Sequence, residues 1–444
     1  MSSTRDDAPS TVAVIGLGKI GLPLAAQFAS SGMNVIGCDV LPSVVATVNA
    51  GRSHIREERG LDEAVAKAVE AGRLRAIEDA SAAAREADTV VVIVPLIVDP
   101  AGTVDFHNLD SATLSIAQGL HRGSLVIYET TVPVGTTRIH LTPRLEEQSG
   151  LKAGTDFFVA FSPERLYSGR IFEDLRRYPK IVGGLDAAST ERAVRFYQRV
   201  LTAEVRAVEN LETAEFAKLA ETTYRDVNIA LANQLATYGA ARSVNVRQAF
   251  DVANSQPFSH LHRPSIGVGG HCIPIYPQFL LSDAVDGELE LVRIGRRTND
   301  RMVESCIKGL QEALGGLDGR RVLVLGASYR EDVKELAFST ALPLVEDLHR
   351  AGAEVLLNDP LFTASELAGF ESTVVDLDSN ALPQVDAVVV QALHEQYRSL
   401  DWTRFRGLRA VYDGRGMLDP DVVGKSGATY LAVGWPQHAV SRKS

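Results

Sequence analysis

The feature that most constrains the fold of this chain is a strand, glycine turn and helix pattern near the N-terminus. The apolar run 12–15 suits a parallel strand that is buried on both faces. Gly16, Gly18 and Gly21 follow with the spacing GxGxxG, in which each glycine meets a separate steric need of a tight turn. The N–H groups that open such a helix bind the diphosphate of a dinucleotide. The pattern predicts a dinucleotide-binding α/β domain, and a glycine turn without a ligand is the alternative.

A second apolar run at 34–38 leads into an acidic residue, Asp39. This acid lies about 20 residues after the glycine turn, which is the spacing of a carboxylate that binds the adenine ribose hydroxyls. A carboxylate there repels the 2′-phosphate of NADP. The expected cofactor is therefore NAD.

The chain has 444 residues, which exceeds the size at which one hydrophobic core stops growing, so two or three domains are expected. A net charge of −11 leaves no basic face for nucleic acid. Three cysteines are too few for a disulfide framework and lack the CxxC spacing of a zinc site, so no metal is expected. No signal peptide is recognisable and no stretch reaches the roughly 18 apolar residues of a membrane helix, so we expect a cytoplasmic protein.

Short apolar runs alternate with helical patterns in two parts of the chain. This alternation predicts two Rossmann-like, doubly wound parallel-sheet lobes. A helical pattern without Gly or Pro until Gly239 predicts a long central helix at about 209–242. Gly326-Ala327-Ser328 does not complete the fingerprint in the second lobe, so this turn is expected to pack or to hold a different nucleotide. The predicted strands lie at 89–95, 124–131, 157–161, 319–326, 352–359 and 385–390.

A single cysteine, Cys272, lies in the glycine-rich stretch 267–274. Glycines allow the backbone to approach a ligand closely, and a nearby cation or helix N-terminus turns a thiol into a thiolate. This arrangement favours a nucleophile, although a buried cysteine beside a glycine turn is the plainer alternative. Cys38 and Cys306 lie in a predicted strand and a predicted helix, so both are expected in the core.

Five motifs occur together in one order along the chain. They are Gly16-Leu-Gly-Lys-Ile-Gly-Leu-Pro, Glu129-Thr-Thr-Val-Pro-Val-Gly-Thr-Thr, Ser162-Pro-Glu164-Arg, Ala217-Lys218-Leu-Ala-Glu and Gly269-Gly-His-Cys272-Ile-Pro. On these motifs the chain resembles the UDP-glucose/GDP-mannose dehydrogenase family over nearly its whole length. The resemblance implies oxidation of the C6 alcohol of a nucleoside-diphosphate hexose to the carboxylate, with two NAD and no metal. It also implies a homodimer built on the long central helix, which needs a partner surface for its apolar faces.

The resemblance also divides the chain and assigns cofactor contacts. The expected parts are a disordered N-terminus 1–10, an NAD-binding Rossmann domain 11–208, a central helical and dimerisation domain 209–305 with the cysteine loop, and a C-terminal sugar-nucleotide-binding domain 306–444. The expected NAD contacts are Gly16, Gly18, Lys19, Ile20, Gly21, Asp39, Pro95 and Thr131.

The residue types suit a four-electron oxidation. A Cys272 thiolate that captures the intermediate aldehyde as a thiohemiacetal allows a second hydride transfer, which leaves a thioester. Lys218 could hold the oxyanion or lower the thiol pKa. Glu164 is the candidate base for water, and Thr131 could fix that water. The alternatives are local roles: a surface charge for Lys218, a cap or ion pair for Glu164 and a turn for Thr131. His271 is expected to be positional.

Three positions depart from the family pattern. Thr222 replaces the usual Asn one helical turn after the lysine, Tyr276 replaces the usual Asp four residues after the nucleophile, and Ala337 stands where many members carry Arg. Thr222 and Tyr276 keep hydroxyl groups for water-mediated hydrogen bonds, but the carboxylate is lost. Both are kept as candidate catalytic residues, and either a divergent substrate or a slower enzyme would fit.

The substrate remains open between several nucleotide sugars. Arg165 and the segment 224–230 resemble the members that oxidise UDP-N-acetylhexosamines, while UDP- or TDP-glucose stays possible. Guanidinium groups bind diphosphate bidentately, although a salt-bridged surface Arg is as common. A single-step NAD dehydrogenase and a non-catalytic sugar-nucleotide binder are the other functional classes. The expected substrate contacts are Glu164, Arg165, Lys218, Arg225, Arg263, Gly269, Tyr329 and Arg330.

Overall fold

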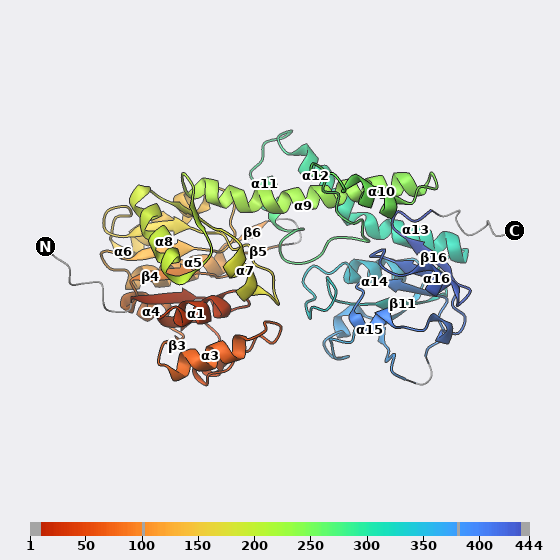
Figure 1. Cartoon of the computed structure of the whole chain (residues 1–444), viewed down its shortest axis with the longest axis horizontal. Helices are drawn as coiled ribbons and strands as arrows, with labels where there is room; N and C mark the ends of the chain where they lie inside the picture. The colour runs from red at the N-terminus through yellow and green to blue at the C-terminus, as the bar shows by residue number, and fades with distance from the viewer. Residues whose placement is uncertain (1–9, 100–102, 380–381, 437–444) are drawn as a thin grey trace. The chain divides into compact units, whose positions relative to one another are not determined.

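The structure is a computed structural model that describes residues 10–99, 103–379 and 382–436 (Figure 1). The chain divides into two compact units between Glu221 and Thr222, and each unit is described by itself. The predicted disordered segment 1–10 lies outside the described residues except for Ser10. No helix in the described ranges is long and apolar enough to cross a membrane.

The first unit is built on a sheet of eight strands in the order β10-β9-β8-β7-β4-β1-β2-β3. All neighbours are parallel except β8 and β9, which pair antiparallel through Ala160 and Gly184. The doubly wound sheet is thus confirmed, with one reversed strand pair that the sequence did not reveal. The strands are β1 (Thr11–Ile15), β2 (Asn34–Cys38), β3 (Leu74–Ile77), β4 (Thr89–Val92), β7 (Leu125–Tyr128), β8 (Phe158–Phe161), β9 (Lys180–Gly184) and β10 (Val205–Ala207). β5 (Ile97–Val98) and β6 (Val104–Asp105) form a separate hairpin.

Helices cover both faces of this sheet and make two cores. Successive residues of β1 point to opposite faces, so Val12 and Val14 join one core and Ala13 and Ile15 the other. Buried Cys38 at the end of β2 belongs to the second core, as predicted. The first core is covered by α1 (Gly21–Ser30), α2 (Pro42–Asn49), α3 (Leu61–Glu70), α7 (Ile171–Arg177) and α8 (Ala187–Val200). The second is covered by α4 (Ala80–Glu86), α5 (His107–Gly119), the π-helix η1 (Thr137–Leu141) and α6 (Thr142–Ser149).

The predicted central helix is confirmed as α9 (Leu211–Ala240), drawn in green in Figure 1. Asn210 caps its start, because the side-chain oxygen of Asn210 accepts a hydrogen bond from the N–H of Thr213. The helix ends where Gly239 accepts the N–H of Arg242 in a turn. The boundary between the two units falls within this helix.

The second unit contains a six-stranded, fully parallel sheet in the order β13-β12-β11-β14-β15-β16. Its three predicted strands are confirmed as β11 (Arg321–Leu325), β12 (Glu354–Asn358) and β14 (Ala387–Val390). The sequence did not single out β13 (Thr373–Val374), β15 (Ala410–Asp413) or β16 (Thr429–Ala432). The helices are α10 (Val246–Ala253), α11 (Tyr276–Leu281), α12 (Glu290–Asp300), α13 (Met302–Leu314), α14 (Ala341–Arg350), α15 (Glu395–Arg398) and α16 (Pro420–Gly424), with 3-10 turns η2 (Ala368–Phe370) and η3 (Trp402–Arg404). Cys306 on α13 is fully buried, as predicted.

Candidate active site

The turn between β1 and α1 has the geometry that a dinucleotide requires. Gly16 has φ of +94°, which favours glycine. A Cβ on Gly21 would lie 1.8 Å from the carbonyl oxygen of Gly16, so the helix can start this close to the strand only with glycine. Gly18 is exposed, and a Cβ there would meet nothing within 4 Å, which leaves open space for a diphosphate. The turn therefore fits the phosphate-binding role predicted for it.

Asp39 follows β2, next to this turn. One carboxylate oxygen accepts the N–H of Leu17 at 2.9 Å and the other accepts the N–H of Leu41 at 3.0 Å. The side chain remains partly exposed, so it can still accept hydroxyl groups of a ribose. Pro95 follows β4, which neighbours β1 in the sheet, and the buried Thr131 follows β7, the next strand beyond β4. Since parallel strands end at one edge, the predicted cofactor contacts gather there, where the strand order reverses. The residues thus fit NAD.

Glu164 and Lys218 come together although 54 residues separate them. Glu164 lies in the turn after β8, and the Lys218 ammonium on α9 donates a hydrogen bond to the Glu164 carbonyl oxygen at 2.5 Å. This contact argues against Lys218 as a freely solvated helix charge. The Glu164 carboxylate itself forms an ion pair with Lys180 on β9. Lys180 was not predicted, because Glu164 and Lys180 become neighbours only through the order of β8 and β9 in the sheet.

The cysteine loop precedes α11 and leaves Cys272 exposed, whereas the other two cysteines are buried. The alternative of a buried Cys272 is therefore wrong. The carbonyl oxygen of Cys272 accepts the N–H of Tyr276 at 2.9 Å, so the thiol-bearing residue is fixed at the start of a helix. Tyr276 stacks on Phe279 with 5.6 Å between ring centroids.

Two glycines hold this loop against residues 329–338. The N–H of Gly270 donates to the carbonyl oxygen of Ala337 at 3.1 Å. A Cβ on Gly269 would lie 2.7 Å from the carbonyl oxygen of Phe338, and one on Gly270 would lie 2.8 Å from the ring of Tyr329. The predicted residues Gly269, Cys272 and Tyr329 therefore belong to one packed substructure of the second unit. His271 is tied to it as well, since its Nε2 lies 3.6 Å from a carboxylate oxygen of Glu335.

The predicted arginines have different environments. Arg165 donates to the Pro179 carbonyl oxygen at 2.6 Å and pairs with Glu221 at 3.6 Å, so it is occupied by protein groups. Arg225 on α9 lies near His262, where burial first and then this positive charge lower the pKa of His262. Thr222 is buried on the same helix. Arg330 lies with its guanidinium carbon 5.9 Å from the ring centroid of Tyr329.

Arg263 lines a cavity of about 280 Å³ in the second unit. Arg247, Arg415 and Trp435 line the same cavity. Arg415 also donates to the Tyr329 carbonyl oxygen at 2.7 Å, which links the cavity to the segment that supports the cysteine loop. None of these three residues was predicted, although Arg415 in an Asp-Gly-Arg turn after β15 was a usable signal. Across the described residues, no group of His, Cys, Asp and Glu side chains could hold a metal ion.

Comparison with known proteins matches the chain to family models along most of its length. The NAD binding domain of the UDP-glucose/GDP-mannose dehydrogenase family matches residues 10–201. The central domain of that family matches residues 212–301, and its UDP binding domain matches residues 323–420.

Individual relatives agree with these matches. UDP-N-acetyl-D-mannosamine dehydrogenase of Pyrococcus horikoshii is 35% identical over 93% of this chain and 97% of its own length. NDP-N-acetyl-D-galactosaminuronic acid dehydrogenase of Ralstonia nicotianae is 33% identical over 92% and 96%. The solved structure of UDP-D-ManNAc dehydrogenase from Pyrococcus horikoshii superposes with a TM-score of 0.88 at 34% identity and covers 96% of this chain and 99% of its own. The chain belongs to the UDP-glucose/GDP-mannose dehydrogenase family, and it is an NAD-dependent nucleotide-sugar dehydrogenase.

Proposed function

We propose that this enzyme oxidises the C6 alcohol of a UDP-N-acetylhexosamine to the carboxylate in two steps through a covalent Cys272 intermediate. The observation that carries this proposal is the exposed thiol of Cys272, fixed in a glycine loop that only glycine can form against Tyr329 and Phe338. An alcohol dehydrogenase that stops at the aldehyde needs no such nucleophile.

In the proposed sequence, the alcohol first becomes an aldehyde. The Cys272 thiolate adds to the aldehyde carbon and forms a thiohemiacetal, whose carbon loses a hydride to give a thioester. Water then attacks the thioester carbon, and the acid leaves as the thiolate is restored. Bound NAD would supply the hydride acceptor for each of the two oxidations.

We assign a role in the proposed reaction to each polar residue of the candidate site. Lys218 stabilises the developing oxyanion with its ammonium group, and Glu164 accepts the proton of the attacking water. The hydroxyl of Thr131 orients that water. Thr222 and Tyr276 supply hydroxyl groups for water-mediated hydrogen bonds where relatives of this chain usually carry an amide and a carboxylate.

The cofactor and the substrate are assigned to different residues. Gly16, Gly18, Lys19, Ile20 and Gly21 would hold the diphosphate of NAD and Asp39 its adenine ribose, with Pro95 and Thr131 nearby at the sheet edge. We assign the sugar nucleotide to the C-terminal part, with the division 11–208, 209–305 and 306–444 kept as a proposal. The cavity lined by Arg263 and Arg415 offers guanidinium groups for its diphosphate and Trp435 for its base.

The preference for an N-acetylated sugar is supported by relatives. Several matched proteins are UDP-N-acetyl-D-mannosamine dehydrogenases, including those of Pyrococcus horikoshii and Escherichia coli, each at least 33% identical to this chain. UDP- and TDP-glucose are the alternatives that a substrate panel must include, because one matched structure is a UDP-glucose dehydrogenase.

The deciding experiment measures NADH at 340 nm and the acid product by mass spectrometry with each candidate nucleotide sugar. Two NADH per acid from a UDP-N-acetylhexosamine is the expected result. One NADH per aldehyde would instead show a single-step dehydrogenase, and binding without NADH would show a sugar-nucleotide binder. Cys272→Ser should abolish acid formation, whereas Cys306→Ala, which removes a buried thiol, should keep the stoichiometry.

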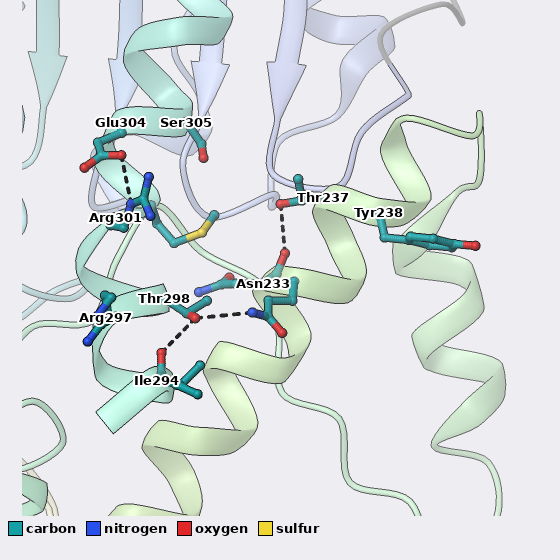
Figure 2. A pocket seen from close by; sticks show the side chains of 11 residues that line it. Asn233, Thr237, Tyr238, Ile294, Arg297, Thr298, Arg301, Glu304 and Ser305 are labelled. Carbon is teal, nitrogen blue, oxygen red and sulfur yellow. Dashed lines mark hydrogen bonds and ion pairs between the residues drawn. The ribbon is translucent and has the colours of Figure 1, made fainter. Parts of the chain in front are cut away.

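The second half of α9 also supports a homodimer. Leu231, Leu235 and Tyr238 on α9 and Ile294 on α12 are exposed apolar side chains. Tyr238 and Ile294 line a cavity of about 600 Å³ in this region (Figure 2). Met302 on α13 lines it as well. A second copy of the chain would cover this face. Leu231→Glu with Leu235→Glu should give a monomer by light scattering, while Leu342→Glu, on the exposed side of α14, should leave the dimer intact.

A further inference from the structure

A buried lysine contacts the candidate base of the reaction. The ammonium group of Lys180 pairs with the Glu164 carboxylate and, at 3.1 Å, with the carboxylate of Glu129. The side chains of Lys180, Glu164 and Glu129 are 4%, 11% and 0% exposed. One cation is therefore shared by two carboxylates that water hardly reaches.

The three side chains come from neighbouring strands. Glu129 follows β7, Glu164 follows β8 and Lys180 begins β9, and these strands are adjacent in the sheet. Tyr197 on α8 donates its hydroxyl to the same Glu129 oxygen, and its ring lies 4.7 Å from the Lys180 nitrogen. The other Glu129 oxygen is buried without a hydrogen-bond partner within the described part of the chain. Sheet order therefore fixes this cluster.

Further titratable and charged groups face the cluster from every element around it. Lys218 on α9 is close enough to disfavour the charge of Lys180. Burial lowers the pKa of Lys180, and its pairing with Glu129 raises it again. The remaining neighbours are Arg165, Asp174 and Tyr178, which line a small cavity beside Glu164.

The shared cation matters because the proposed reaction changes the charge of Glu164. A base that takes a proton from water becomes neutral for the time of the step. A buried ammonium whose only partner became neutral would be left uncompensated, which is strongly unfavourable. The Glu129 carboxylate also contacts Lys180, so the cation keeps a second partner in both protonation states of Glu164.

We propose that Lys180 and Glu129 form a positioning pair that holds the Glu164 carboxylate and lets it accept and release a proton during thioester hydrolysis. Neither residue touches the substrate in this role. The inference rests on the proposed function, since it concerns the hydrolytic step of that mechanism. It adds two positioning residues to that step.

The test is the pH dependence of single-turnover acyl-enzyme hydrolysis, followed by intact-mass spectrometry. Glu129→Gln leaves Lys180 with Glu164 as its only ionised partner, which favours the carboxylate of Glu164. In the plot of hydrolysis rate against pH, the acid limb of this variant should move about one pH unit down. The plateau rate should be about tenfold lower because a weaker base remains. Lys180→Met removes the cation, so its acid limb should move about one unit up. Shifts in opposite directions are the expected signature.

Two further variants keep the test decisive if Lys180→Met folds poorly. Lys180→Arg keeps the cation and should leave the acid limb in place. The double variant Lys180→Met with Glu129→Gln removes both charges together and should place the limb between those of the single variants. Limbs that stay at the wild-type pH, or move in one direction, while only the plateau falls would overturn the inference.

The same experiment separates this inference from the proposed function. A wild-type enzyme that forms no mass adduct on Cys272 during turnover contradicts the covalent mechanism itself. The other outcome is an adduct on Cys272 that forms in the wild-type enzyme and accumulates in Glu164→Gln. If the acid limbs of the Lys180 and Glu129 variants are then unshifted, the positioning pair alone is overturned.

Discussion

The sheet of the first unit and the sheet of the second unit each begin, in chain order, with a buried parallel strand, a glycine of positive φ and a second strand followed by aspartate. Gly16 and Gly326 have φ of +94° and +91°, and Asp39 and Asp359 follow β2 and β12. From this shared start the two units diverge. In the first, α1 begins at Gly21, directly after the turn, while in the second a segment of loop separates Gly326 from α14, which begins at Ala341.

The two aspartates show what this difference does. Asp39 accepts backbone N–H groups but stays partly exposed. Asp359 is buried and accepts hydrogen bonds from the N–H groups of Ala327, Ser328 and Leu361 and from the Ser328 hydroxyl. His394 adds another, because its Nδ1 accepts the Asp332 N–H and leaves Nε2 as the donor to Asp359. One acid can still bind a ligand, and the other is fully engaged in holding a loop.

The loop that Asp359 holds is the one that supports the cysteine. His394 fixes Asp332, which has a φ of +55°, and Phe338 further along has a φ of +49°. Such values are uncommon for residues other than glycine and persist only when neighbours enforce them. This segment carries Tyr329 and Ala337 to Gly269 and Gly270. The same strand order thus presents the proposed cofactor turn in one unit and a support for the cysteine loop in the other.

Buried carboxylates should give the two units opposite responses to pH, and this is the largest effect we expect. Glu215 accepts the N–H groups of Gly135 and Thr137, yet burial raises its pKa to about 7. A raised pKa means that stability is present below the unfolded value near 4.5 and is lost as pH rises through 7. Wild type should therefore lose about 3 kcal/mol relative to Glu215→Gln between pH 4 and pH 8, measured by urea unfolding.

Asp359 gives the contrasting case in the second unit. Burial opposes its ionisation, but the His394 hydrogen bond and backbone N–H groups outweigh it, so the pKa of Asp359 is lowered. Its stabilisation is present above the unfolded pKa of about 3.9 and is lost as pH falls through the lower folded value. Glu212→Gln is the control for the first unit, since the hydrogen bond from Arg138 lowers the pKa of Glu212. If the free energy of unfolding depends on pH equally in wild type and Glu215→Gln, this contrast between the two units is wrong.

Gly270→Ala tests whether the second unit's loop positions the nucleophile. The new Cβ would lie 2.8 Å from the Tyr329 ring at a φ of +92°, so the cysteine loop must shift. A displacement of about 1 Å at a reacting group costs roughly 100-fold in rate, which is the expected fall in kcat. NAD affinity, measured by calorimetry, should not change.

Gly427→Ala is the matched control for that substitution. Gly427 has a φ of +79°, and a Cβ there would meet nothing within 4 Å, so this variant carries the backbone strain without the clash. A similar fall in kcat for both variants would mean that general destabilisation, and not the position of the loop, explains the result.

The sequence predicted what local patterns encode. Apolar runs located the central strands, the absence of Gly and Pro located α9, and glycine spacing located the turn before α1. The reversed strand β9 was missed, because a run of apolar residues carries no direction. Lys180 was missed for a related reason: its partners Glu129 and Glu164 become neighbours only through the order of β7, β8 and β9.

The role of the second turn was predicted only in outline. Its incomplete glycine pattern indicated packing or a different ligand, and the packing against the cysteine loop depends on Tyr329, Ala337 and Phe338, which no periodicity marks. Trp435 lines the arginine cavity from a segment that showed no motif. Such contacts join residues far apart in the sequence, and they depend on tertiary structure more than on local propensity.

Asp359→Asn and Asp39→Asn replace each of the two carboxylates by an amide and so test the contrast between their roles. Asp359→Asn turns part of a buried acceptor into a donor that faces the His394 N–H, so the free energy of unfolding should fall by about 2 kcal/mol. Asp39→Asn should change stability by less than about 0.5 kcal/mol, as is usual for partly exposed positions, but should weaken NAD binding. Urea unfolding and NAD calorimetry on both variants check this, and weaker NAD binding in Asp359→Asn alone would reverse the assignment.

The smallest effect concerns the choice between the two nicotinamide cofactors. Asp39→Ala removes the negative charge that would meet the 2′-phosphate of NADP and the acceptor for the ribose hydroxyls of NAD. NAD affinity should fall about tenfold, which is about 1.4 kcal/mol, while NADP affinity stays constant or rises. Asp79→Ala removes the carboxylate that caps α4 in the same unit, so it should cost about 1 kcal/mol of stability without changing the cofactor ratio. If both variants keep the wild-type preference for NAD, Asp39 supports the turn through Leu17 and Leu41 alone, and the two units would then use their aspartates in the same structural way.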